Sequence, residues 1–105
     1  SRVTMVTMTE FGRRFTENSN RGLDHGAAGT MLVLGGSVAG GKIYGHWPGL
    51  SDAALDNGSL RVTTDYRQVL LEVLRNRGGL SAVQLANVLP NFGAPDLGFT
   101  KPLSV

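Results

Sequence analysis

Asp24 and His25 are adjacent in a glycine-rich stretch, and an acid beside a histidine is a pair that can bind a metal. A carboxylate oxygen and an imidazole nitrogen together suit Zn²⁺, Mn²⁺ or iron. The apolar residues 30–34 follow closely and are expected to form a buried strand. Polar side chains at the mouth of such a strand are where α/β proteins place their chemistry. The alternative is an ordinary loop, in which Asp24 accepts hydrogen bonds from backbone amides and Gly26 adopts a positive φ.

Glu10 is a third candidate ligand, because it directly follows residues 3–8, which are rich in β-branched side chains and predict a central strand. If strands 3–8 and 30–34 are neighbours in a parallel sheet, Glu10 lies at the same edge as the acid–histidine pair, Asp24 and His25. The alternative is an ion pair between Glu10 and an arginine three or four residues later.

The segment after the second strand carries two further motifs. Residues 36–42 match the G-x-x-x-x-G-K spacing of a phosphate-binding loop. Ile43 replaces the required Ser or Thr, however, and no helix pattern follows, so a nucleotide site is not predicted. His46 and Trp47 precede a proline. Trp47 is expected to anchor the glycine-rich loop, and contact of His46 or Trp47 with a substrate is the alternative.

The composition limits the remaining possibilities. The 105 residues are 41% hydrophobic and 17% charged, which suits one domain or part of a larger one. Without cysteine, disulfides, cysteine-ligated zinc and cysteine nucleophiles are excluded. A net charge of +2 without a run of Lys or Arg gives no nucleic-acid footprint. No apolar stretch approaches the ~20 residues of a membrane span.

The clearest predicted helix spans 65–77, with Thr64 as its N-cap and Gly78 as a left-handed stop. Its apolar spacing predicts one buried face, formed by Val69, Leu70, Val73 and Leu74. A second, short helix at 82–87 is expected to start at Ser81. The tail from residue 91 is expected to be extended, with two docking side chains, Phe92 and Phe99.

Five short motifs occur in order along the chain: TEFGR at 9–13, DHG at 24–26, LGG and GG within 34–41, YGHWPGL at 44–50, and TDYR at 64–67. Together they resemble the C-terminal part of a bacterial family, domain-of-unknown-function family 1501. That family looks like a branch of the alkaline phosphatase and sulfatase superfamily. The resemblance covers nearly all of the chain.

The resemblance implies an α/β fold in which residues 1–105 are a single segment, the C-terminal part of an alkaline-phosphatase-like α/β/α sandwich. Glu10 resembles the acidic metal ligand and His25 resembles a later histidine ligand. Phe11 stands where another histidine ligand is expected. Since a phenyl ring cannot bind a metal, either one of two metals is lost or Asp24 compensates.

The function implied by the resemblance is metal-dependent hydrolysis of phosphate or sulfate esters, with zinc, calcium or manganese as the divalent metal. Arg13 is expected to contact the anionic ester, because a guanidinium matches phosphate and sulfate bidentately; His46 is a second candidate contact. The nucleophile would precede Ser1, so the isolated chain is expected to be inactive. The alternative is a non-catalytic surface or scaffold protein that keeps the fold; Phe11 favours this alternative, and the DHG motif favours the hydrolase.

The resemblance also bears on location and partners. It implies a secreted or periplasmic protein. The chain starts directly in a strand pattern, so further residues are expected before Ser1. The missing strand neighbours would leave sheet edges and apolar faces uncovered. The expected partner is therefore the remainder of a parent chain or a second copy.

Overall fold

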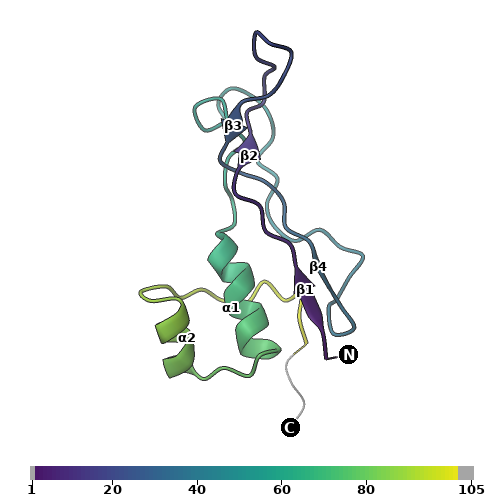
Figure 1. Ribbon diagram of the computed structural model, residues 1–105, viewed down its shortest axis with the longest axis vertical. Helices are drawn as coiled ribbons and strands as arrows, with labels where there is room; N and C mark the ends of the chain where they lie inside the picture. Colours follow the sequence, from purple (N-terminus) through teal and green to yellow (C-terminus); the bar gives the residue numbers. More distant parts are fainter. Residues whose placement is uncertain (1, 102–105) are drawn as a thin grey trace. The chain divides into compact units, whose positions relative to one another are not determined.

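The computed structural model describes residues 2–101 of the chain. The elements follow one another in the order β1 (Thr4–Val6), β2 (Gly12–Arg13), β3 (His25–Gly26), β4 (Val33–Gly35), α1 (Tyr66–Asn76) and α2 (Ala82–Val88) (Figure 1). The chain is therefore mixed α/β, as its sequence predicts. Within the described residues, unit 1 contains 2–5, 33–45 and 64–101, and unit 2 contains 6–32 and 46–63. No helix within residues 2–101 is long and apolar enough to cross a membrane.

β1 pairs with β4 in a two-stranded sheet. The Thr7 amide donates to the Leu32 carbonyl oxygen at 2.9 Å, whereas Gly35, further along, lies against the carbonyl oxygen of Val3. Residue numbers thus fall on one strand as they rise on the other, so the pairing is antiparallel. The parallel sheet on which the convergence of Glu10 with the acid–histidine pair depended is not formed. A parallel pair needs a long crossover, usually a helix, and the chain between β1 and β4 contains β2 and β3 instead.

Several large apolar side chains of this ribbon are exposed. Met5 on β1 is 58% exposed, and Leu32 and Leu34 are 61% and 50% exposed. The expectation that residues 30–34 form a buried strand is therefore wrong for the described residues. A sheet buries its apolar face only where another layer covers it, and a ribbon of two short strands cannot supply that layer itself.

α1 starts at an aspartate cap. The side chain of Asp65 accepts a hydrogen bond from the backbone amide of Arg67 at 2.9 Å and also pairs with its guanidinium at 2.7 Å. Thr64 was the predicted cap, and this prediction is wrong, because a carboxylate can accept from both groups at once. At the other end, Gly79 rather than Gly78 adopts the left-handed conformation, with a φ of 67°.

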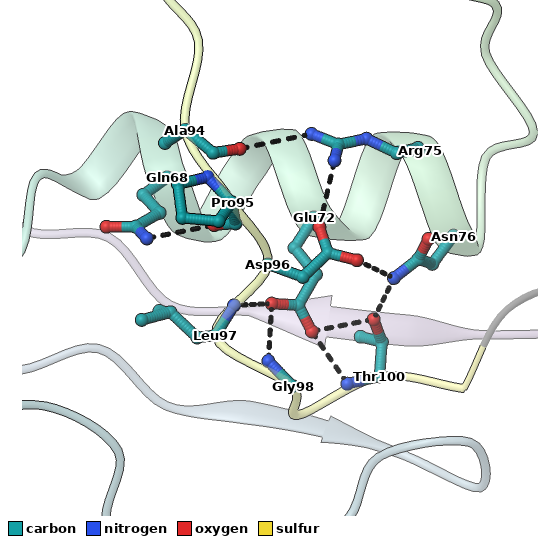
Figure 2. A network of polar contacts seen from close by, with 10 residues as sticks. All are labelled: Gln68, Glu72, Arg75, Asn76, Ala94, Pro95, Asp96, Leu97, Gly98 and Thr100. Atoms are coloured by element: carbon teal, nitrogen blue, oxygen red, sulfur yellow. Dashed lines mark hydrogen bonds and ion pairs between the residues drawn. The ribbon is translucent and has the colours of Figure 1, made fainter.

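The buried side of α1 differs from the predicted one. Val69 is buried as expected, but the other buried residues are Leu71, Glu72 and Asn76. The remaining predicted positions, Leu70, Val73 and Leu74, are only half-buried. The difference arises because the C-terminal tail packs along a polar side of the helix and buries Glu72 and Asn76 (Figure 2).

α2 starts at Ser81 as predicted, with a capping box. The Ser81 hydroxyl accepts from the backbone amide of Gln84 at 3.3 Å, and the Gln84 side chain accepts from the Ser81 amide at 2.8 Å. This reciprocal pair satisfies two amides that have no partner within the helix. Leu85 is the buried residue of α2.

The described part of the tail, residues 91–101, forms no helix or strand, and Phe99 docks as predicted. Phe99 is 3% exposed and meets the ring of Tyr44 edge-on, with ring centroids 5.9 Å apart. Backbone hydrogen bonds fasten the tail to an earlier loop: the Ala39 amide donates to the Phe99 carbonyl at 2.8 Å, and the Lys101 amide donates to Ser37 at 3.0 Å. These contacts hold the tail against the rest of unit 1.

Candidate functional site

The pairing of β2 with β3 joins two of the sequence motifs, TEFGR and DHG. The strands are antiparallel, with Gly12 opposite Gly26 and Arg13 opposite His25. A Cβ on Gly12 would lie 1.6 Å from the carbonyl oxygen of Ala28, and one on Gly26 would lie 2.5 Å from the backbone of Arg13. Only glycine permits this close approach, so both glycines are needed to bring the two motifs together.

Phe11, Arg13 and His25 share one side of this pairing. Arg13 and His25 are cross-strand partners, and Phe11 precedes Arg13 by two residues, the period of one strand face. The rings of Phe11 and His25 are stacked, with centroids 3.6 Å apart and planes 21° apart. The Arg13 guanidinium carbon lies 5.0 Å from the Phe11 ring centroid, and its Nη1 donates to the carbonyl oxygen of Leu23 at 3.0 Å. These three residues form a cation–aromatic–imidazole cluster, here called the Phe–Arg–His face.

Asp24 is held by the loop that precedes β3. Its carboxylate accepts a hydrogen bond from the side-chain amide of Asn18 at 3.0 Å. The role of accepting from backbone amides, proposed for Asp24 in an ordinary loop, belongs to Asn18, whose side-chain oxygen accepts from Asn20 and Gly22 at 2.9 Å each. Gly26 lies in β3, and its φ is not positive. Both details of the ordinary-loop alternative are therefore wrong.

Glu10 and His46 make few contacts. The side chain of Glu10 is exposed and forms no hydrogen bond or ion pair with another residue in 2–101, so its alternative pairing with Arg13 or Arg14 is absent there. Arg14 instead donates to the carbonyl oxygen of Asn57 at 2.9 Å. His46 is exposed, and its carbonyl oxygen accepts from the Thr63 hydroxyl at 2.8 Å. No hydrogen bond, ion pair or ring contact among residues 2–101 joins His46 to the Phe–Arg–His face.

The three predicted metal ligands do not form a metal site by themselves within residues 2–101. Residues 2–101 contain no group of three or more His, Cys, Asp or Glu side chains positioned to hold a metal ion. Glu10, Asp24 and His25 are therefore not gathered into one ligand set by these residues. Among the three, His25 fits a ligand best. Its ring is exposed, its nitrogens make no hydrogen bond to a described residue, and its plane is held by Phe11.

The TDYR motif has a structural role in this chain. The pKa of Asp65 is lowered mainly by the hydrogen bond from the Arg67 side chain and then by the one from its amide. The same side-chain bond raises the pKa of Arg67. The guanidinium of Arg67 also lies over the ring of Phe92, 4.2 Å from its centroid. The motif therefore caps α1 and fastens the start of the tail.

One polar network is not predicted from the sequence. Glu72 is completely buried, and its carboxylate accepts hydrogen bonds from the amides of Leu97, Gly98 and Thr100 and from the Thr100 hydroxyl (Figure 2). Asn76 donates to both Asp96 and Thr100, at 2.9 and 3.0 Å. Because all these bonds fasten the tail to α1, the network is structural. Its only signal in the sequence is an acid and an amide four residues apart on one helix.

The first 76 residues of the chain match the family described as Protein of unknown function (DUF1501). The chain belongs to this family. The matched residues include all four strands and α1, and with them the Phe–Arg–His face and Glu72. No curated protein and no solved structure shows a significant match to the chain.

Proposed function

We propose that this chain is the C-terminal part of a metal-dependent hydrolase of phosphate or sulfate esters, built on an alkaline-phosphatase-like α/β/α sandwich. The proposal rests on the resemblance of five ordered motifs to family 1501, which looks like a branch of that superfamily. The single observation that carries it is the β2–β3 pairing, which brings the TEFGR and DHG motifs together. β2 and β3 meet at glycines that leave no room for a Cβ, and the side chains of Arg13 and His25 stay exposed beside them, which supports the proposal.

In this proposal His25 supplies an imidazole ligand, and the carboxylates of Asp24 and Glu10, which residues 2–101 do not gather around it, would join it only in the full-length protein. A bound zinc, calcium or manganese ion would activate a nucleophile and neutralise the ester oxygen. Arg13 retains guanidinium donors beyond the one used on Leu23 and would hold the anionic group; His46 is the second proposed anion contact. The remaining ligands and the nucleophile would come from the N-terminal part of the parent protein.

The test uses the full-length parent, purified without added chelator. Its metal content is measured by mass spectrometry, and its activity is measured on aryl phosphates and aryl sulfates. We expect a bound divalent metal and ester hydrolysis, both lost on His25→Ala. His46→Ala is the matched variant, since it removes the chain's other histidine and should keep the metal. If His25→Ala retains full metal content and activity, the proposal fails.

A second candidate is a non-catalytic, secreted or periplasmic scaffold protein that keeps the fold. The observation in its favour is that Phe11 occupies a position where the resemblance expects a histidine ligand, and packs against the remaining histidine. The exposed apolar side chains of β1 and β4 suit a protein that functions by association. A parent protein free of metal and inactive on both ester classes, yet folded, would favour this candidate.

A further inference from the structure

We infer that Arg13 and His25 together bind a tetrahedral oxyanion, the phosphate or sulfate group of a ligand, on the Phe–Arg–His face. The inference rests on one part of the proposed function, the contact of Arg13 with an anionic group. It goes beyond that part, because it adds His25 as a second contact and involves no metal.

The Phe–Arg–His face carries hydrogen-bond donors, and the nearby carboxylates do not neutralise it. Asp24 precedes His25 by one residue, so the alternation of side chains along an extended chain places Asp24 on the opposite side. The Arg14 amide donates to the Asp24 carbonyl oxygen at 3.0 Å, which extends the strand pairing to this residue. Neither Asp24 nor Glu10 forms an ion pair with Arg13 among residues 2–101. A face of this kind attracts anions rather than metal cations.

The guanidinium of Arg13 is oriented before any ligand binds. Its Nη1 donates to the carbonyl oxygen of Leu23 at 3.0 Å, and its central carbon lies 5.0 Å from the Phe11 ring centroid. Its Nε and Nη2 donate to no residue in 2–101. These two atoms form one edge of the guanidinium, and their parallel N–H bonds match two oxygens of one phosphate or sulfate group.

His25 places a further donor beside this edge. It is the cross-strand partner of Arg13, and the Cβ atoms of such a pair lie about 4.5–5.5 Å apart. Its ring is stacked on Phe11 with centroids 3.6 Å apart, it is exposed, and its nitrogens make no hydrogen bond within residues 2–101. Even a neutral imidazole carries one N–H donor. The guanidinium and the imidazole both lie against the Phe11 ring, at a separation that one oxyanion with a hydrogen bond on each side can span.

The backbone holds the two donors in this arrangement. Gly12 lies opposite Gly26, and a Cβ on either would collide with the facing backbone. Exposed ion pairs are usually weak, partly because two long side chains must be ordered. Here the strand register, the bond to Leu23 and the contacts with Phe11 order both side chains in advance, so less entropy is lost on binding.

The experiment uses the 105-residue chain, treated with a chelator and then dialysed, so that no metal takes part. Inorganic phosphate, sulfate and acetate are titrated separately at constant ionic strength. Binding is followed by NMR at the His25 ring protons and the Arg13 Nε–H. The phosphate and sulfate arms identify which oxyanion is preferred, and the acetate arm tests whether any anion is sufficient.

Two variants test the two contacts. Arg13→Lys keeps the charge but removes the parallel N–H pair, and we expect it to raise the dissociation constant of the preferred oxyanion about tenfold. His25→Ala removes one neutral donor and should raise it about threefold. Arg21→Lys is the matched control and should stay near wild type, because Arg21 is exposed, belongs to the same unit, and its guanidinium makes no hydrogen bond within residues 2–101.

The stacked ring of Phe11 shifts the His25 ring protons upfield, and this shift reports whether Arg13→Lys keeps the β2–β3 pairing. If the shift is lost, the wild-type chain decides alone: signals of both Arg13 and His25 must move with saturable binding of phosphate or sulfate. Movement at both residues, with weaker binding in the two variants, supports the inference. An equal loss in Arg21→Lys, acetate binding as tight as that of both oxyanions, or no movement at His25 overturns it.

The failure of this inference and the failure of the proposed function give different results. If the metal-free chain binds neither oxyanion while the full-length parent loses its metal and activity on His25→Ala, the inference fails and the proposed function stands. If the chain binds the oxyanion while the parent is free of metal and inactive, the inference stands and the hydrolase proposal fails.

Discussion

The buried carboxylate of Glu72 is the contact whose loss should most loosen the C-terminal tail. Its Oε1 accepts from the amides of Leu97 and Gly98, and its Oε2 accepts from the amide and hydroxyl of Thr100. In Glu72→Gln one oxygen becomes an NH₂ group. If that group replaces Oε2, it faces the Thr100 amide, which also donates and cannot turn away. The Thr100 hydroxyl can rotate to accept from the new NH₂, so the loss falls mainly on one backbone amide.

The expected cost follows from two effects. A buried donor without a partner costs about 1–3 kcal/mol. The bonds to Leu97 and Gly98 also weaken, because a charged acceptor binds roughly twice as strongly as a neutral one. Together they give about 2–4 kcal/mol for Glu72→Gln. Glu72→Ala removes all four bonds and should cost more. Domains are stable by only about 5–15 kcal/mol, so either change is large.

Hydrogen exchange of the Leu97, Gly98 and Thr100 amides is the direct assay, combined with urea unfolding of the same protein. Exchange at these amides should accelerate in Glu72→Gln, and the free energy of unfolding should fall. Glu17→Gln is the control, because Glu17 is exposed and forms no hydrogen bond within residues 2–101; such a change costs less than about 0.5 kcal/mol. Equal exchange rates in wild type and Glu72→Gln would refute the reasoning.

Three further predictions concern other parts of the chain. Gly12→Ala places a methyl group 1.6 Å from the Ala28 carbonyl oxygen, so β2 and β3 should separate. The upfield NMR shift that the stacked ring of Phe11 gives the ring protons of His25 should then disappear, and its persistence would contradict this. The lowered pKa of Asp65 stabilises the folded chain at pH values above 3.8, the usual pKa of the group, and this stabilisation is lost as the pH falls through the pKa of the folded state. The loss of stability in Asp65→Asn should therefore be smaller in acid. Equal losses in denaturation experiments at neutral and acidic pH would count against this. The exposed Leu34 on β4 predicts that the 105-residue chain self-associates and that Leu34→Glu reduces this in sedimentation experiments; a monomer at every concentration tested would exclude it.

The features predicted correctly from the sequence are local ones. The second helix starts at Ser81, where a capping box joins residues three apart. The first helix, predicted at 65–77, spans Tyr66–Asn76, because its good helix formers and apolar spacing act within a few turns. Phe99 docks as expected, since a large aromatic side chain in an irregular tail has few other ways to leave water.

Features that depend on distant residues were not predicted. The sequence around Val69 favours an apolar buried face, but the tail buries Glu72 instead, through amides more than twenty residues away. The choice of Asp65 over Thr64 as the cap depends on the position of the Arg67 guanidinium. The antiparallel pairing of β1 with β4 depends on the path of the chain between them. Apart from Arg67, which lies two residues from Asp65, these partners lie outside the window that a periodicity covers.

The candidate site shows the same division. The residue types that could bind a metal or an anion are visible in the sequence, and so are the glycines beside them. What joins TEFGR to DHG is the register of β2 on β3, with Gly12 opposite Gly26. Two-residue strands leave almost no periodic signal. The stacking of Phe11 on His25 follows from that register, so it too could not be predicted from the motifs alone.

Phe11 is the residue at which the two proposed functions diverge. In a scaffold protein a phenyl ring beside a histidine serves packing, and packing favours burial of both rings. Here the imidazole stays exposed, and its nitrogens make no hydrogen bond within residues 2–101. A contact that restrains a ring while leaving its polar edge accessible does little for a core. The two candidates therefore differ in what they require of His25: the hydrolase needs it for its metal content, and the scaffold protein does not.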